Sequence, residues 1–329
     1  QRIFKTQFSL DIWDETNHKE ARPVLGLPKE ADWVFYSPFR YDRALFRNAF
    51  MYTLSNRIGW YAPRWRFCEV FLNTDGGPLN YKDDYFGVYM ISEKIEQGPK
   101  RVDVQAMHAS ISEGPELTGG YIWKRDWAGP DEKGFMAGGL PFIMTHPDES
   151  EITKPQLNYL KNHLNAFAEV LNGPDFKGPD GYRRFIDMDS WIDHWWLNVL
   201  PMNCDAFGLS HYLHKDRNGR IRLGPIWDFD RSLGSRNPHD DDPEVWFGER
   251  SSDYFKVGWL ERLFQDEDWE QGIIDRWYTL RQGAFSLEEM FTSIDRMAES
   301  LNEAQERHFA AWRTLRQPPG QYDLANKIL

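Results

Sequence analysis

Cysteine is scarce in this sequence. The 329 residues contain two cysteines, Cys68 and Cys204, which excludes a disulfide framework and a cysteine-ligated zinc cluster. Basic residues are also in deficit, because 39 Lys and Arg stand against 51 Asp and Glu and give a formal net charge of −12. Nucleic-acid binding needs clustered Lys and Arg, so this balance argues against a nucleic-acid partner and for a basic one. No apolar run reaches the roughly 18 residues that a membrane span requires.

Two nucleotide-binding motifs are missing as well. The Gly-rich stretch 129–139 has no G-K-[ST] ending, so it is not a P-loop and we expect it to be a connection. The chain also has no G-x-G-x-x-G loop and no His-Arg-Asp tripeptide. An ordinary protein kinase carries both of these motifs, so the sequence argues against that class.

Aromatic residues, in contrast, are abundant. The chain holds 15 Trp and 22 Phe, and hydrophobic residues make up 41% of it. Such an excess fits either a large core or a surface on which sugar rings stack. Most of these residues fall within regular apolar patterns, so we interpret them as core residues.

Apolar periodicity predicts a mixture of strands and helices. Strands are expected around Phe8 to Ile12 and over 32–36, 64–72, 85–93, 119–126 and 140–144. Helices are expected over 42–59, 153–171, 190–200, 254–263, 267–282 and 287–315, the first capped by Asp42 and the third by Asp189. The fold class is therefore α+β. We expect a β-rich region over 1–150 and a mainly helical region over 151–329, with the division near 145–155.

A hairpin separates two acidic positions in the second region. Residues 209–214 form a plausible strand, Asn218-Gly219 is a strong hairpin turn signal, and 220–223 form the return strand. Asp205 precedes this hairpin, and Asp228 and Asp230 follow it. Because the hairpin folds the chain back on itself, the carboxylates can converge at one end of it. Converging carboxylates repel one another and need a cation or a shared proton, and Mg²⁺ with a phosphate ligand is one solution.

An Asp, a hairpin and an Asp in a D-F-x turn follow one another in the core of a protein kinase. The amino-acid sequence around these positions resembles the CotH kinase family, the spore coat protein H-like group of atypical secreted kinases. The resembling segments are P-I-W-D-F-D-R-S-L-G (225–234), N-C-D (203–205), D-W-V-F-Y-S-P-F-R-Y-D-R-A-L-F-R-N (32–48), Y-F-G-V-Y-M-I-S-E-K-I-E (85–96) and G-G-Y-I-W-K-R-D (119–126). They occur in the family's order and cover most of the chain up to about residue 235.

The resemblance implies an atypical, kinase-like two-lobed fold, with an antiparallel-sheet first lobe and a mainly helical second lobe. It implies transfer of the ATP γ-phosphoryl group, with Mg²⁺, to Ser or Thr of a secreted, spore-coat or cell-surface protein. Asp205 would orient or deprotonate the acceptor hydroxyl.

The resemblance also assigns residues to the nucleotide and its metal. Asp228 would hold the metal, with Asp230 as second choice. Lys124 or Lys94 would contact phosphate, and Glu93 could pair with a lysine as in kinases. The family commonly has an Asn five residues after the catalytic Asp, but this chain has Ser210, a weaker metal ligand.

Two other functions stay open. The chain could be a catalytically weak or inactive surface, assembly or adhesion protein that keeps the fold as a scaffold. It could also be a carbohydrate-active or carbohydrate-binding protein that uses its carboxylates and Trp residues. For the kinase, the acidic run at 240–242 within 237–253 suggests a basic protein substrate. Transfer to Ser or Thr, which the resemblance implies, would suit a substrate that is also Ser-rich. Gln1 is not an initiator methionine, so we expect an upstream segment to be missing.

Overall fold

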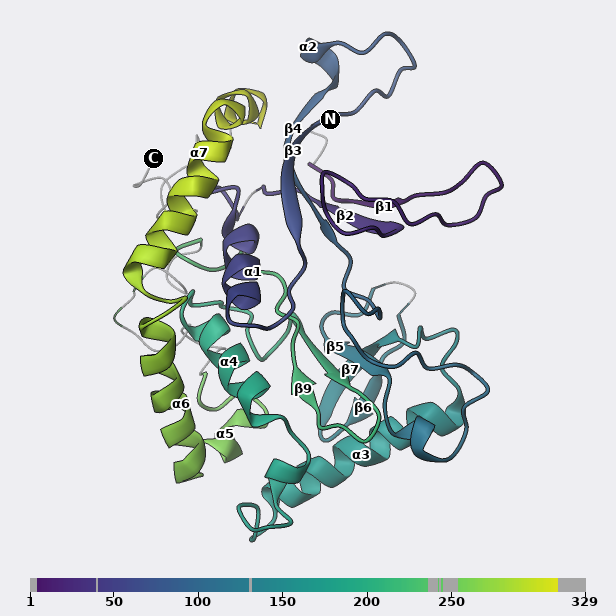
Figure 1. The fold of residues 1–329 in the computed structure, drawn as a ribbon, viewed down its shortest axis with the longest axis vertical. Helices are drawn as coiled ribbons and strands as arrows, with labels where there is room; N and C mark the ends of the chain where they lie inside the picture. The colour runs from purple at the N-terminus through teal and green to yellow at the C-terminus, as the bar shows by residue number, and fades with distance from the viewer. Residues whose placement is uncertain are drawn as a thin grey trace.

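A computed structural model describes residues 5–39, 41–129, 132–235, 242, 244 and 254–312 (Figure 1). The strands are β1 (Phe8–Asp11), β2 (Asp32–Tyr36), β3 (Trp65–Phe71), β4 (Tyr85–Glu93), β5 (Tyr121–Arg125), β6 (Phe135–Ala137), β7 (Leu140–His146), β8 (His211–Lys215) and β9 (Arg222–Leu223). The α-helices are α1 (Arg47–Arg57), α2 (Tyr81–Asp84), α3 (Lys154–Asn172), α4 (Met188–Val199), α5 (Leu260–Leu263), α6 (Glu267–Arg281) and α7 (Leu287–Trp312). Antiparallel sheets and separate helices confirm the predicted α+β class.

The first sheet has the strand order β1-β2-β4-β3 and lies in the upper part of Figure 1. Helix α7 packs against β4, and Gly87 permits the close approach. Its φ is 98°, and a Cβ there would lie 2.9 Å from Nδ1 of His308 on α7. The same Nδ1 accepts a hydrogen bond from the backbone N–H of Val88 at 3.1 Å. Helix α7 thus packs directly against β4 of the first sheet.

The second sheet has the order β6-β7-β5-β8-β9 and contains the predicted hairpin. The hairpin turn is closed by the hydrogen bond from Gly219 N–H to Asp216 O at 3.0 Å. Strand β5 pairs with both β7 and β8, so the strands of 121–146 belong to the same sheet as the hairpin. The two sheets therefore divide between Glu93 and Tyr121. The division into a β-rich and a mainly helical region, expected near 145–155, falls between β7 and α3 and stays a prediction.

Helix α4 lies at the centre of the core, as its nearly continuous apolar surface predicted. Its three tryptophans, Trp191, Trp195 and Trp196, are all buried. Their indole N–H groups donate to backbone carbonyls of residues far along the chain, at 2.9 to 3.1 Å. These bonds supply the partner that a buried indole needs. The core interpretation therefore holds for these residues, although Trp127 is 78% exposed and Trp13 is 52% exposed.

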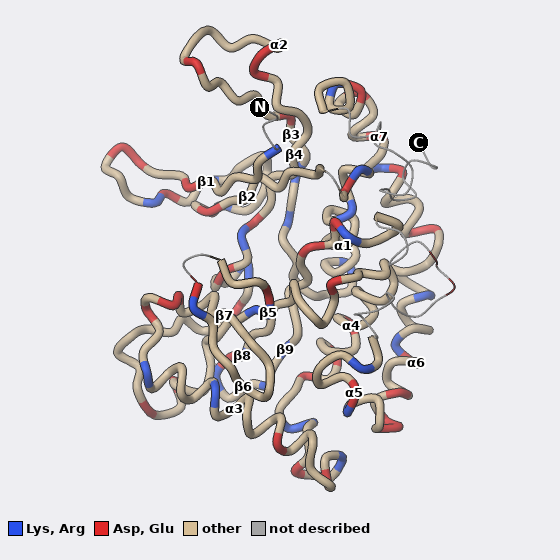
Figure 2. Tube along the Cα trace, turned by 180° about the vertical axis from the view of Figure 1, so that it is seen from behind, with Lys and Arg blue, Asp and Glu red and all other residues tan. Residues whose placement is uncertain are grey.

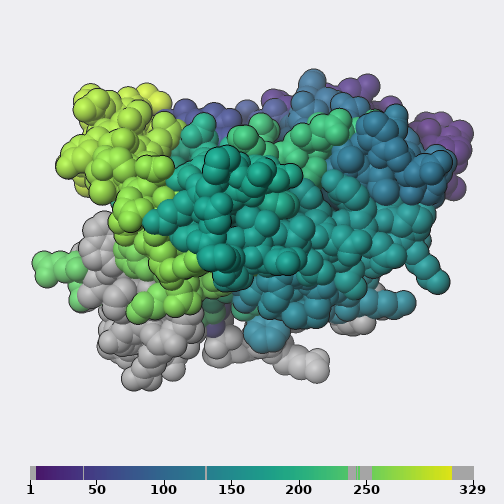
Figure 3. Space-filling model, turned by 90° about the horizontal axis from the view of Figure 1, so that it is seen from below, coloured from purple at the N-terminus to yellow at the C-terminus, as the bar shows by residue number. Residues whose placement is uncertain are grey.

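On the helical side of the molecule, the segment that follows α3 contacts the start of α6. The teal segment after α3 lies against α6, drawn yellow-green, in the view from below (Figure 3). The hydroxyl of Tyr182 donates to Asp266 at 2.7 Å, and Lys177 and Glu267 form an ion pair. Basic and acidic residues are interspersed over these elements (Figure 2). None of the helices among the described residues combines the length and apolar character that a membrane crossing requires.

Two helix starts differ from the prediction. Helix α1 begins at Arg47 and not after Asp42, because Leu45 has a φ of 67° that a right-handed helix cannot contain. Helix α4 is capped by Asp187 and not Asp189, since the Asp187 carboxylate accepts from Ser190 N–H at 3.1 Å.

Two further segments also differ from the prediction. Strand β6 falls within the stretch 129–139 that we expected to be a connection. Of the predicted helix 254–263, only α5 is α-helical. The predicted substrate loop 237–253, apart from residues 242 and 244, lies outside the described residues.

Candidate active site

The predicted convergence of acidic residues occurs at the end of the hairpin. The segment that follows α4 runs beside the segment that follows β9. Cys204 N–H donates to Arg231 O at 3.3 Å, and Leu233 N–H donates to Pro201 O at 2.7 Å. These bonds bring Asp205 next to the D-F-D turn formed by Asp228, Phe229 and Asp230.

Asp205 is held by an arginine that the sequence analysis did not assign. Nη1 of Arg231 lies 2.9 Å from each carboxylate oxygen of Asp205. Both side chains are about three-quarters buried, with exposures of 25% and 22%. The backbone N–H of Asp205 also donates to the side chain of Asn203 at 3.3 Å. The Asp205 carboxylate is therefore fixed in position by a neighbouring charge.

The D-F-D turn is anchored by helix α1. Phe229 is fully buried, and its backbone N–H donates to Oδ1 of Asn48 at 2.8 Å. Asp228 has a φ of 62° and Ser210 a φ of 54°, so both lie in the left-handed region that costs energy for residues other than glycine. The hydroxyl of Ser210 donates to Oδ2 of Asp228 at 3.3 Å. The turn is thus strained and is held by contacts with distant parts of the chain.

The electrostatics of this site disfavour the ionised carboxylates. Burial, followed by the negative charges of Asp205 and Asp126, raises the pKa of Asp228 to about 6. Burial and the charges of Asp228 and Asp42 raise the pKa of Asp230 well above its usual range, against the opposing effect of Arg231. Closely placed buried carboxylates with one nearby cation provide the hard oxygen donors that Mg²⁺ prefers. Asp228 and Asp230, with the Ser210 hydroxyl beside them, therefore fit such an ion.

Asp126 is a member of this acidic group that the sequence analysis missed. It follows β5, and the preceding residue, Arg125, pairs with His211 at the start of the hairpin. Burial is the largest cause of the raised pKa of Asp126, and Asp205 contributes to it. Its only signal in the sequence was its place at the end of the segment 119–126. The pairing of β5 with β8 was needed to bring it to the site.

Lys124 is the predicted phosphate-binding residue that lies nearest to this group in the fold. It sits on β5 opposite Tyr212 of the hairpin, and its Nζ is 2.9 Å from Oε1 of Glu132. Lys94 is exposed just after β4, and the carboxyls that its charge affects include Asp32 and Glu96. Lys94 is thus associated with a different set of carboxylates.

Glu93 does not form the kinase-like pair with a lysine that the sequence suggested. It is 1% exposed, and its carboxylate accepts from Nε of Arg64 at 2.9 and 3.0 Å. The reason is strand register. Trp65 pairs with Ser92, which places Arg64 directly beside Glu93 at the end of the first sheet.

A second acidic group lies apart from this site. Among the described residues, Glu30, Asp32 and Glu96 bring three carboxylate oxygens within 4.8 Å of one another. Arg101 pairs with Glu30 and Glu96, and Lys19 pairs with Asp32. Arg101 and Lys19 thus offset two of the three negative charges that this group can carry.

The comparison with known families agrees with the resemblance found in the sequence. The sequence model of the family described as CotH kinase protein matches residues 1–326, which is nearly the whole chain. No curated protein matches the chain.

Proposed function

The chain belongs to the CotH kinase family, and on that premise we propose that it is an atypical protein kinase. It transfers the γ-phosphoryl group of ATP to a Ser or Thr hydroxyl of a secreted, coat or surface protein. The observation that carries this proposal is the convergence of Asp205, Asp228 and Asp230 at the end of the hairpin, with Lys124 on β5, the strand that pairs with β8 of the hairpin. These are the acidic and basic groups that phosphoryl transfer requires.

Asp228 and Asp230 would hold Mg²⁺, with Ser210 as a weaker neutral ligand. When bound, the ion neutralises charge on the phosphates of ATP. The negative charge of Asp126 adds to the attraction for a cation. Lys124 would exchange its ion pair with Glu132 for a contact with phosphate. Lys94 and Glu93 remain proposed contacts, with less support because Glu93 already binds Arg64.

Asp205 would orient the acceptor hydroxyl and accept its proton. The hydroxyl oxygen forms a bond to the γ-phosphorus while the bond from that phosphorus to the β–γ bridging oxygen breaks, and ADP leaves. The proton of the hydroxyl passes to the Asp205 carboxylate. Arg231 fixes the orientation of this carboxylate through its two contacts of 2.9 Å. Catalysis then depends on positioning and electrostatics.

The arrangement of the elements supports a kinase-like two-lobed fold. The sheet β1-β2-β4-β3 with α1 would form the first lobe, and the hairpin with α3 to α6 would belong to the second. The D-F-D turn would lie at the junction of these lobes, because it contacts Asn48 of α1 and follows β9. The net charge of −12 fits a basic protein substrate, and a Ser-rich one would offer the hydroxyl groups that the proposed transfer needs.

A non-catalytic scaffold of the same family is the second candidate. The observation that favours it is the combination of Ser210, where the family commonly has Asn, with the occupied carboxylate of Asp205. A scaffold could keep the fold and lose nucleotide binding without consequence.

Calorimetric titration of the full chain with ATP and Mg²⁺ tests the proposal. We expect metal-dependent binding that Asp228→Ala abolishes. The matched control is Asp180→Ala, because the Asp180 side chain is 94% exposed and belongs to a surface ion pair. Circular dichroism checks that each variant is folded. No heat from the folded natural chain would refute the kinase.

A transfer assay then separates the two candidates. Radiolabelled ATP with a basic, Ser-rich peptide should yield labelled peptide, and Asp205→Asn should abolish the labelling. ATP binding without any transfer to peptide or protein would favour the scaffold.

A further inference from the structure

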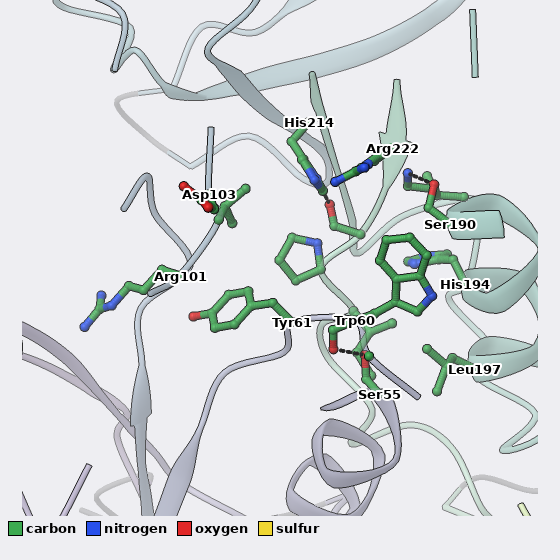
Figure 4. Close-up of a pocket in the computed structure, with 16 residues that line it drawn as sticks. Ser55, Trp60, Tyr61, Arg101, Asp103, Ser190, His194, Leu197, His214 and Arg222 are labelled. Atoms are coloured by element: carbon green, nitrogen blue, oxygen red, sulfur yellow. Dashed lines mark hydrogen bonds between the residues drawn. The ribbon is translucent and has the colours of Figure 1, made fainter. Parts of the chain in front are cut away.

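The structure contains a cavity of about 200 Å³ on which the proposed chemistry does not depend (Figure 4). Its walls come from the C-terminal end of α1 and the turn after it, from α4, and from the segment that follows β9. None of the residues that line it belongs to the acidic group around Asp228. A dry cavity of about 150 Å³ can hold benzene, so this one has room for a small ring compound.

The polar side chains in the wall have hydrogen-bond partners in most cases. His214 Nδ1 is 2.9 Å from Gly224 O, and the hydroxyl of Ser55 donates to Trp60 O at 3.0 Å. The hydroxyl of Ser190 accepts from Leu223 N–H at 3.3 Å. These bonds are the dashed lines in Figure 4. These polar groups already have partners within the protein, so a ligand would gain little by forming hydrogen bonds with them.

Among the described residues, the Tyr61 hydroxyl and Nε of Arg101 also line the cavity and have no hydrogen-bond partner, but His194 is the side chain with two such atoms. His194 belongs to α4, is 3% exposed, and neither of its ring nitrogens has a hydrogen-bond partner among the described residues. Burial, with a further contribution from His211, lowers the pKa of His194 well below its usual value. Its ring is therefore neutral and carries one N–H donor and one acceptor nitrogen. Unpaired buried polar atoms cost free energy, which a ligand with complementary atoms would recover.

The charges in the wall are already engaged. Arg222 pairs with Asp187 at 3.0 Å, and Arg101 pairs with Glu30 and Glu96. Asp103, the other charged residue that lines the cavity, is exposed to solvent at its edge. A charged ligand would therefore find no free partner of opposite sign in the interior of the cavity.

The remaining wall is flat and apolar. Figure 4 shows the rings of Trp60 and Tyr61 on the side of the cavity that follows α1. Pro225 and Ile226 also line the cavity. Flat aromatic walls favour a planar ligand, which stacks on them with little loss of conformational freedom.

We infer that this cavity is a binding site for a small uncharged planar ring compound that presents a hydrogen-bond donor or acceptor to His194. The site goes beyond the proposed kinase activity and does not require it. Pro225 and Ile226 lead directly to Trp227 and Asp228, so a bound compound contacts the segment that carries the D-F-D turn.

Benzimidazole is a suitable probe, because at neutral pH it is uncharged and has a donor and an acceptor on one ring edge. The full chain is titrated with benzimidazole while the imidazole nitrogens of His194 are followed by ¹H–¹⁵N NMR. We expect saturable shifts of both His194 nitrogens in the natural protein. Indene has the same shape without the nitrogens and should bind on the order of tenfold more weakly.

His194→Phe keeps a ring and removes both nitrogens, so it should weaken benzimidazole binding on the order of tenfold and raise the melting temperature. His163→Phe is the matched control. His163 lies on α3 outside the cavity and also has an unpartnered nitrogen, Nε2. It should leave binding unchanged.

Three results would overturn the inference: unshifted His194 nitrogens at saturating benzimidazole, equal binding of indene, or unchanged binding to folded His194→Phe. If that variant does not fold, the NMR titration of the natural protein decides alone.

Discussion

Arg231 Nη1 contacts both carboxylate oxygens of Asp205 at 2.9 Å, although the two residues lie on opposite sides of the hairpin. This pair connects the end of the segment after α4 to the D-F-D turn. It fixes the proposed base before any acceptor hydroxyl arrives. During the proposed reaction, the Asp205 carboxylate must contact the acceptor hydroxyl and Arg231 at the same time.

Removal of this pair should destabilise the protein. Arg231→Met leaves a largely buried carboxylate without its partner and should lower the free energy of unfolding by about 1–3 kcal/mol. Urea unfolding of Arg231→Met, Asp205→Asn and the double variant gives the coupling between them. Arg184→Met, in the exposed pair with Asp180, is the control and should cost under about 1 kcal/mol. Zero coupling between Arg231 and Asp205 would contradict the role of the pair.

The acidic group should make the metal-free protein less stable as the pH rises. The pKa of Asp228 in the fold is raised to about 6, so the folded state holds a proton there that the unfolded chain releases from about pH 4 upward. This group's contribution to stability is therefore lost as the pH rises from about 4 to about 6.

Asp228→Asn removes this effect. At pH 7.5 it should be more stable than the natural protein by about 1–3 kcal/mol, and the gain should vanish below about pH 4. Urea unfolding across this pH range measures it. Asp148→Asn is the control with the opposite sign, because hydrogen bonds from Ser150 lower the pKa of Asp148. A variant Asp228→Asn no more stable than the natural chain at pH 7.5 would exclude the raised pKa.

Asp126 should contribute to cation binding. Asp126→Asn removes a negative charge beside Asp228 and should weaken Mg²⁺ binding about fivefold, as expected for a nearby charge at a partly screened site. Calorimetry of the folded variant with Mg²⁺ alone measures the change. Asp180→Asn on the exposed surface should leave the affinity as it is. Equal affinities for Asp126→Asn and the natural chain would place Asp126 outside the metal site.

Asn48 should support the D-F-D turn through the backbone. Asn48→Ala leaves the buried N–H of Phe229 without an acceptor and should lower the free energy of unfolding by about 1–3 kcal/mol. It should also weaken Mg²⁺ binding, because the turn carries Asp228. Asn165→Ala removes a similar acceptor, the one for Gly138 N–H at 2.7 Å, and should not alter Mg²⁺ binding. If both variants bind Mg²⁺ equally well, Asn48 supports stability alone.

Ser210 offers a gain-of-function test of the proposed metal site. Ser210→Asn supplies an amide carbonyl, and Asn tolerates the observed φ of 54° better than Ser does. In the presence of ATP we expect tighter Mg²⁺ binding, on the order of several-fold, by calorimetry. Ser210→Ala should bind Mg²⁺ no more tightly than the natural chain. Tighter binding by Ala than by Asn would refute a ligand role at this position.

Local signals determined much of this protein. Alternating apolar residues predicted the strands, and Asn218-Gly219 predicted the hairpin between β8 and β9. The hairpin brought Asp205 and Asp228 to one end, as expected from the sequence. The family resemblance was confirmed over residues 1–326. These features depend on neighbours in the chain, so the sequence carries them directly.

Tertiary structure decided the partners of each charge. Pairing of β5 with β8 brought Asp126 to the site. The register of β3 and β4 placed Glu93 beside Arg64, with which it forms an ion pair. The left-handed Leu45 moved the start of α1 to Arg47, and packing of this helix on the second part of the chain joined Asn48 to Phe229 of the D-F-D turn. Each of these contacts joins residues far apart in sequence, where several partners of the right charge compete. Strand register and packing select among them, and no local pattern records that choice.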